Sequence, residues 1–240
     1  MRALSLRLRL RFRLGALLPA LMILSGIGLV LSPGAVAGQA EDAQRLVDKA
    51  RITVDAFRDD PNMAALRALA KDAKALFIVP QLIKGGFIFA GEGGTGVLLT
   101  REGGWSAPAF YTMAAGSIGF QIGGQTSEVV LVLMTDRALD AVLQNKVKLG
   151  ADVGVAAGPL GGGVETAIAT NLRADIYTYA KSKGLFAGIS FEGAVITERG
   201  KLNRAYYGRR VSPEDIVIRR TVDNPNANRL RTSLDGLIAR

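Results

Sequence analysis

Apolar residues recur at steps of three and four within Glu41–Arg58, and this spacing predicts an amphipathic helix. Asp60 and Pro61 then form a typical helix start, an N-cap residue followed by proline, and they predict a second helix that runs to about Asp72. From Ala75 onward the pattern changes to short apolar or alternating runs separated by glycines, which is typical of strands. We therefore expect helices first and a sheet after them.

The sheet is predicted from short segments bounded by turn-forming residues, and Glu102-Gly103-Gly104 is typical of a hairpin turn between two of them. The predicted strands are Leu76–Val79, Phe87–Ala90, Val97–Thr100, Ala109–Ala114, Gly119–Ile122, Val129–Met134, Gly150–Ala156, Glu165–Thr170, Ala174–Tyr179 and Leu185–Ile196. Helices are predicted where Thr135-Asp136 caps a segment to about Gln144, and in the tail at Arg204–Tyr207, Pro213–Ile218 and Asn228–Ile238. The fold class expected is α+β: an antiparallel, glycine-rich sheet, barrel-like if it closes, with helices at the N- and C-terminal ends.

The N-terminal segment has the pattern of a secretory signal peptide. Met1–Arg13 is basic, Leu14–Leu31 is apolar, and Ala35-Val36-Ala37 has the small residues of a cleavage site. We expect residues 1–37 to be removed, with a cut after Ala40 as the alternative, which leaves one domain over residues 38–240. A second alternative is an uncleaved anchor, because the apolar run is close to the length that spans a bilayer. Either outcome predicts an exported protein that is periplasmic or associated with the cell envelope.

Composition excludes several kinds of chemistry. The chain has no cysteine and no histidine, which excludes disulfides, thiolate or imidazole metal ligands, cysteine nucleophiles and serine–histidine relays. Carboxylates are present, but nothing in the sequence brings two of them across one cleft. We expect a protein that is not an enzyme and that needs no metal or cofactor. The net charge of +9 includes five arginines of the leader, so the remainder carries only about +4, too little for a nucleic-acid-binding domain.

Two glycine-rich stretches have the look of phosphate-binding loops. Gly91–Gly96 fits the pattern G-x-G-x-x-G, but Val97–Thr100 continues it as a strand rather than as the helix that a nucleotide site needs. Gly158–Gly163 lacks the Lys-Ser/Thr ending of a P-loop. We interpret the first as a sharp turn and the second as a turn between strands, and expect no nucleotide site.

A series of short runs over Lys74–Gly208 resembles one known family. In order, the runs are Ala73–Pro80, Lys84–Phe87, Gly116–Gln125, Leu133–Asp136, Lys148–Asp152, Lys183–Gly188, Phe191–Gly193 and Asn203–Gly208. Their order and spacing resemble the SYLF domain, a lipid-binding module of bacterial envelope proteins and of eukaryotic proteins at membranes. The resemblance implies lipid binding, with phosphoinositides as ligands of the eukaryotic relatives, and it brings no enzymatic activity and no metal.

Lysines near turns and strand ends are the candidate lipid-binding residues: Lys84, Lys146, Lys148, Lys181 and Lys183. Isolated lysines also occur as ordinary solvated surface, and that alternative stays open. As headgroup contacts, each would contribute on the order of 1 kcal/mol at an anionic membrane. The helix over Glu41–Arg58 mixes both charges on its polar face, which favours core packing over adsorption to a membrane.

Two functions follow from these observations. The first is a non-enzymatic lipid- or phospholipid-binding domain that contacts anionic headgroups at the cell envelope. The alternative is a structural or scaffolding envelope protein that binds protein or cell-wall partners. The expected partners are an anionic phospholipid or membrane surface and, in the alternative, an envelope protein, with no nucleic acid and no nucleotide.

Overall fold

The computed structural model describes residues 33–86, 89–118, 125–160, 174–182, 185–188 and 191–239. Residues Ser32–Arg240 form one compact unit. The predicted strands Gly119–Ile122 and Glu165–Thr170 lie outside the described residues, as does nearly all of the predicted leader.

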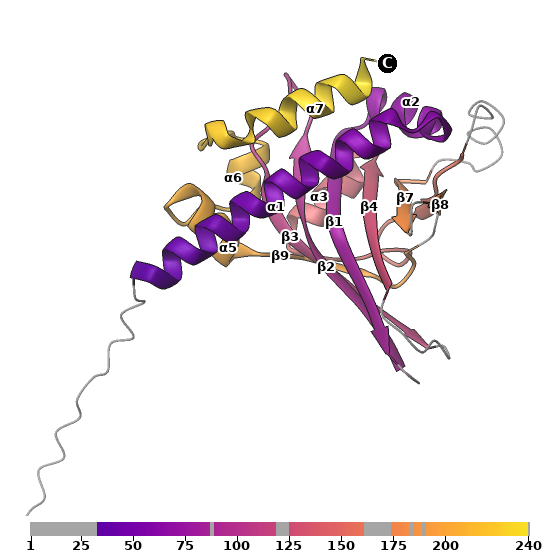
Figure 1. The fold of residues 1–240 in the computed structure, drawn as a ribbon, viewed down its shortest axis with the longest axis horizontal. Helices are drawn as coiled ribbons and strands as arrows, with labels where there is room; N and C mark the ends of the chain where they lie inside the picture. Colours follow the sequence, from indigo (N-terminus) through magenta and orange to yellow (C-terminus); the bar gives the residue numbers. More distant parts are fainter. Residues whose placement is uncertain are drawn as a thin grey trace, which may run out of the picture. The chain divides into compact units, whose positions relative to one another are not determined.

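Within the described residues, nine strands form one sheet in the order β5-β9-β3-β2-β1-β4-β7-β6, with β8 also paired to β7. The sheet curls into a half-barrel (Figure 1). The strands are β1 (Ala75–Gly86), β2 (Phe89–Thr100), β3 (Ala109–Ile118), β4 (Gln125–Leu133), β5 (Lys146–Lys148), β6 (Val155–Ala157), β7 (Ile176–Ser182), β8 (Leu185–Gly188) and β9 (Val195–Glu198). The predicted α+β class, with a barrel-like sheet and helices at both ends, is confirmed.

The sheet differs from the prediction in one pairing. The described strand pairs are antiparallel except β6 with β7, which run parallel, with Val155 beside Ile176. A parallel pair needs a crossover rather than a tight turn, and the chain between Ala157 and Ile176 is long enough to make one. The predicted turn over Gly91–Gly96 is also wrong, because this segment lies inside β2.

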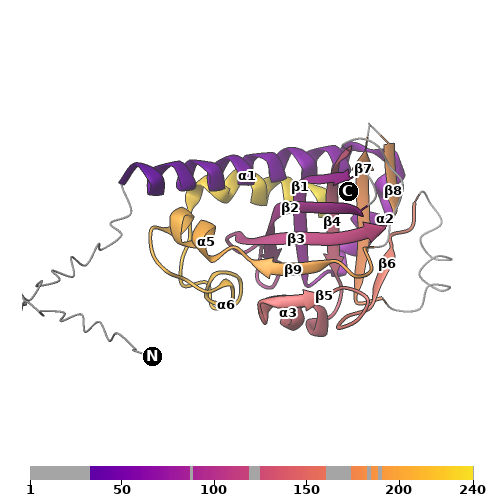
Figure 2. The same ribbon diagram turned by 90° about the horizontal axis from the view of Figure 1, so that it is seen from below.

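Helices cover both faces of the sheet. The helices are α1 (Pro33–Asp59), α2 (Ala64–Asp72), α3 (Asp136–Leu143), α5 (Gly200–Tyr207), α6 (Pro213–Val217) and α7 (Asn228–Ile238), with 3-10 turns at Pro61–Met63 and Pro225–Ala227. Residues of α1, α2, α5 and α7 share one core cluster with one face of the sheet, and residues of α3 and α6 share another with the opposite face. Figure 2 shows α1 running along the sheet, with α7 beside it. Among the described helices, none is long and apolar enough to cross a bilayer.

The first helix is longer than its apolar pattern predicts. α1 begins at Pro33, eight residues before the predicted start at Glu41, so the predicted cleavage motif Ala35-Val36-Ala37 is helical here. The side chains of its apolar stripe are each at most 1% exposed; they are Ala43, Val47, Ala50, Val54 and Phe57. The prediction that this stripe serves core packing is therefore confirmed.

The central strand β1 contains an irregularity at Pro80. Its register shifts between Ile78 and Gln81 against β2, and between Val79 and Leu82 against β4. Proline has no backbone N–H to donate to a neighbouring strand. A central strand therefore tolerates proline only where its regular pairing is interrupted. Leu76 and Ile78 face the α1 side before the shift, whereas Leu82 belongs to the opposite core cluster after it. The shift therefore turns Gln81 and Ile83 toward the α1 side.

Two glycines of β2 lie against this irregularity. A Cβ on Gly96 would stand 2.3 Å from the Ile78 carbonyl oxygen, and one on Gly94 would stand 2.4 Å from that of Gln81. No side chain fits at such distances, so glycine is required where the two backbones approach closely.

We expect Gly96→Ala to lower the free energy of unfolding by about 2 kcal/mol or more, because the methyl group overlaps backbone and must displace β1. Urea denaturation would measure the loss. Gly91→Ala is the control in the same strand, since a Cβ there meets nothing within 4 Å. Equal stability of the two variants would contradict this account of the irregularity.

Candidate functional site

A groove of about 610 Å³ lies between α1, the outer half of the β1–β2 hairpin and the start of α5. Its lining residues are Gln39, Asp42, Arg45, Leu46, Lys49, Gln81, Ile83, Gly93, Gly94, Thr95, Arg199, Lys201 and Leu202. We call it the basic groove. The irregularity in β1 builds its floor, because it directs Gln81 and Ile83 into the groove opposite the glycines of β2.

Cations outnumber carboxylates in the basic groove. Arg45 and Lys49 line it from α1, Arg199 and Lys201 line it from the β9–α5 junction, and Asp42 is the one carboxylate in the lining. All four cations are exposed. Positive charges gathered around a concave surface raise the local concentration of anions. The groove is therefore suited to bind a negatively charged group.

The ion pairs and hydrogen bonds of Arg45, Lys49 and Arg199 are weak enough to leave these side chains available to an anion. Arg45 pairs with Asp42 and, at 3.5 Å, with Glu41, but the side chains are 60% or more exposed and such surface pairs contribute little. The Lys49 ammonium donates to the Gln81 amide oxygen at 3.4 Å, and Arg199 donates to a threonine hydroxyl of β3 at 3.3 Å. Lysine and arginine here meet neutral acceptors or solvated carboxylates, which an incoming anion can replace.

A second hollow, of about 770 Å³, lies on the other side of α5 and shares Lys201 with the basic groove. Arg204 and Arg210 also line it. Its two carboxylates are engaged: Glu198 accepts from the Asn203 amide at 3.2 Å, and Asp215 pairs with an arginine at 2.7 Å. The described residues give Lys201, Arg204 and Arg210 no ion-pair partner, so the basic surface continues around α5.

Asn203 fixes α5 against the sheet. It is fully buried, and its amide oxygen accepts the backbone N–H of Phe110 on β3 at 2.9 Å. The Tyr206 ring packs edge-on against Phe110, with 5.1 Å between centroids, and the Tyr207 hydroxyl donates to the Pro108 carbonyl at 2.7 Å. These contacts hold the inner face of α5 and turn its cations outward.

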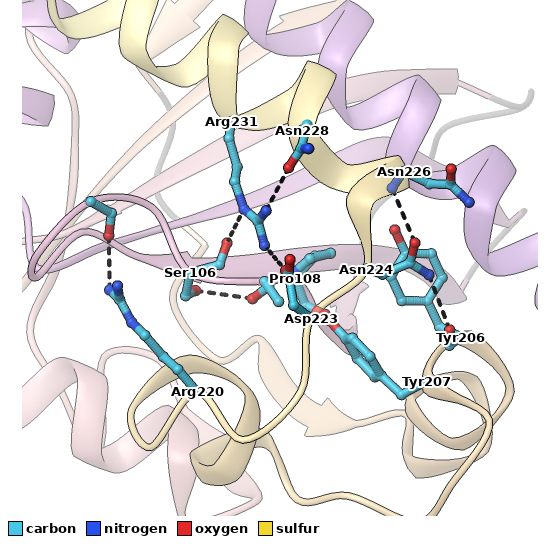
Figure 3. A network of polar contacts seen from close by, with 12 residues as sticks. Ser106, Pro108, Tyr206, Tyr207, Arg220, Asp223, Asn224, Asn226, Asn228 and Arg231 are labelled. Atoms are coloured by element: carbon cyan, nitrogen blue, oxygen red, sulfur yellow. Dashed lines mark hydrogen bonds and ion pairs between the residues drawn. The ribbon is translucent and has the colours of Figure 1, made fainter.

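The C-terminal segment braces α5 through a polar network (Figure 3). Arg231 on α7 pairs with Asp223, and it donates to Asn228 at 2.7 Å and to the Ser106 carbonyl at 3.2 Å. Hydrogen bonding from this guanidinium lowers the pKa of Asp223, so the pair stays charged well below neutral pH. Asn224 reaches the last turn of α5, where its side chain donates to the Tyr206 carbonyl at 3.2 Å.

The lysines predicted from the sequence are not brought together. Lys146 and Lys148 lie on β5 at one end of the strand order, whereas Lys181 lies on β7 near the other end and pairs with Glu128 at 3.5 Å. Lys84 lies between them on β1, on the face opposite α1. Lys183 lies outside the described residues. The described four do not line the basic groove, and their role as headgroup contacts stays a prediction.

Sequence reasoning missed Arg199 and Lys201. They lie four and two residues before the run Asn203–Gly208 that carries part of the family resemblance, and that proximity is a signal in the sequence. The other two cations of the groove, Arg45 and Lys49, lie on a helix far earlier in the chain, and only the fold brings the two pairs of residues to one groove.

Within the described ranges, no cluster of carboxylates could hold a metal ion.

We expect Asn203→Ala to lower the free energy of unfolding by about 1–3 kcal/mol, because it leaves the buried Phe110 N–H without its acceptor. Urea denaturation provides the measurement. Arg204→Ala, one position along on the exposed side of α5, should change stability by less than about 0.5 kcal/mol. A loss as large from Arg204→Ala would show that α5 is not held by its inner face.

Comparisons with known proteins agree on one group of relatives. A family model described as Ysc84, "Las17-binding protein actin regulator", matches residues 114–237. The human SH3 domain-containing YSC84-like protein 1 is 34% identical over 206 residues, which cover 85% of this chain and 59% of that protein. LAS seventeen-binding protein 3 of Saccharomyces cerevisiae is 41% identical over 143 residues, 58% of this chain and 31% of that protein. The matched region thus spans less than two thirds of the length of each of these relatives.

Proposed function

Because the chain belongs to the Ysc84 family, also named SYLF, we propose that it is a non-enzymatic binding domain that docks on anionic phospholipid surfaces through its basic groove. The family is linked to lipid binding and to actin. The observation that carries the proposal is the excess of cations in the groove, four against one carboxylate, beside an exposed Ile83.

The electrostatics favour a surface over a small ligand. Each basic residue near an anionic membrane contributes on the order of 1 kcal/mol, so the groove and the neighbouring Arg204 and Arg210 together reach useful affinity. The cations of the groove project from exposed positions on α1 and at the β9–α5 junction. A flat array of phosphates can contact several of them at once.

The proposed location is the cell envelope. Its support is the leader pattern of residues 1–37, with a basic segment, an apolar segment and small residues in order. Docking would then take place on a membrane that faces the exported protein.

A second candidate function is the scaffold, and a different hollow favours it. This hollow, of about 750 Å³, is lined by charges of both signs, among them Lys71, Arg101, Asp72 and Asp235, and by the exposed Ile218. Mixed charge beside apolar surface suits a polypeptide better than a membrane. One relative is named for binding a protein, as LAS seventeen-binding protein 3.

Flotation of Ser32–Arg240 with vesicles tests the proposal. We expect binding to vesicles that contain phosphatidylglycerol, weaker binding at high salt, and none to neutral vesicles. A variant with Lys49, Arg199, Lys201 and Arg204 changed to Gln should bind at least about 100-fold more weakly, since four contacts are removed.

A matched variant removes the same number of charges elsewhere, at Lys71, Lys74, Arg101 and Arg229, none of which lines the basic groove or is a predicted headgroup contact. It should float like the parent. Equal loss in both variants would show that only net charge matters, and the groove assignment would fall. Absence of flotation with every vesicle would overturn the lipid-docking proposal and favour the scaffold.

A further inference from the structure

Two large apolar side chains stand exposed beside the cations of the basic groove. Ile52 on α1 is 53% exposed, and Ile83 on β1 is 52% exposed. Ile52 lies three residues after Lys49, on the same side of the helix, and Ile83 lies two residues after Gln81, on the same face of the strand. The Lys49–Gln81 hydrogen bond therefore has one isoleucine on each side.

The two isoleucines belong to neighbouring hollows. Ile83 lines the basic groove, and Ile52 lines a smaller hollow of about 270 Å³ between α1, β1 and β4. Both hollows are lined by Lys49 and Gln81. A continuous surface thus combines cations and exposed apolar side chains, which is the arrangement of proteins that bind at the boundary between headgroups and acyl chains.

We propose that Ile52 and Ile83 insert into the boundary layer of an anionic bilayer while the cations of the basic groove contact the phosphates, with α1 still packed on the sheet. This inference rests on the proposed function and adds which residues enter the membrane. It assigns the membrane to the outward side of α1 and to the hairpin end of β1, rather than to the apolar stripe of the helix.

Insertion of the stripe itself would require α1 to leave the sheet. Val47, Val54 and Phe57 are at most 1% exposed, and they share a core cluster with residues of α7 and the sheet. The buried Thr53 hydroxyl also donates to Glu128 on β4 at 3.1 Å. Detachment would expose this core and break that bond, whereas Ile52 and Ile83 are already available.

The chain has no cysteine, so single labels can be placed without background. Ile52→Cys and Ile83→Cys would each carry an environment-sensitive fluorophore, and Ile218→Cys, at 44% exposure, is the matched control. With vesicles of phosphatidylglycerol and phosphatidylcholine, we expect blue-shifted emission from labels at 52 and 83. Lipids with a nitroxide high on the acyl chain should quench those labels and leave the label at 218 unchanged.

A fourth variant, Ala50→Cys, reports on α1. Ala50 is fully buried in the stripe, so its thiol should react slowly with a soluble maleimide, equally with and without vesicles. Faster reaction with vesicles would show detachment of the helix and overturn the inference. Unchanged emission at 52 and 83, with flotation intact, would overturn it while the proposed function stands.

The double variant Ile52→Ser/Ile83→Ser separates the two contributions. Because salt screens the cations but not apolar insertion, we expect this variant to lose the part of flotation that survives high salt. Retention of that part would count against insertion. If the unlabelled chain does not float at all, the proposed function fails, and this inference fails with it.

Discussion

The break in β1 at Pro80 is the constraint on which the sheet and the groove both depend. A central strand has neighbours on both sides, and a residue without an N–H fits there only where the ladder is interrupted. The interruption brings the β1 backbone so close to β2 that Gly94 and Gly96 admit no side chain. It also changes which residues of β1 face α1: even-numbered residues such as Ile78 do so before the break, and odd-numbered residues such as Ile83 do so after it. The inner half of β1 thus supports the core, and its outer half supports a surface.

Local signals in the sequence explain most of what could be predicted. The spacing of apolar residues identified α1 and α2, and Thr135 caps α3 as expected, with its hydroxyl accepting the Ala138 amide at 3.1 Å. The parallel pairing of β6 was missed, because strand direction follows from the path of the connection and leaves no mark on the strands. The glycines of Gly91–Gly96 predict a turn but lie in a strand, because close backbone approach and tight turns require the same residue.

The candidate site shows where local signals end. The five predicted lysines lie near turns or strand ends in the sequence, but the strand order distributes the described ones across the sheet. The groove instead combines α1 with the β9–α5 junction, and α5 is held there by the buried Asn203. Residues that carry the family resemblance, such as Asn203 and Tyr207, serve packing, while the neighbouring cations face solvent. The run Asn203–Gly208 and the groove residues Arg199 and Lys201 are thus close in sequence, but the run holds α5 in place and the cations line the groove.

The packing of α1 against α7 also orders events in time. The core that buries the stripe of α1 includes Leu230, Leu234 and Leu237, which belong to α7 and are far from α1 in the sequence. Contacts between residues so far apart in sequence form late and slow the folding of a domain. A chain that emerges from its N-terminus cannot complete this core until α7 is present. The apolar stripe of α1 therefore stays without its full packing partner for most of the synthesis of the domain.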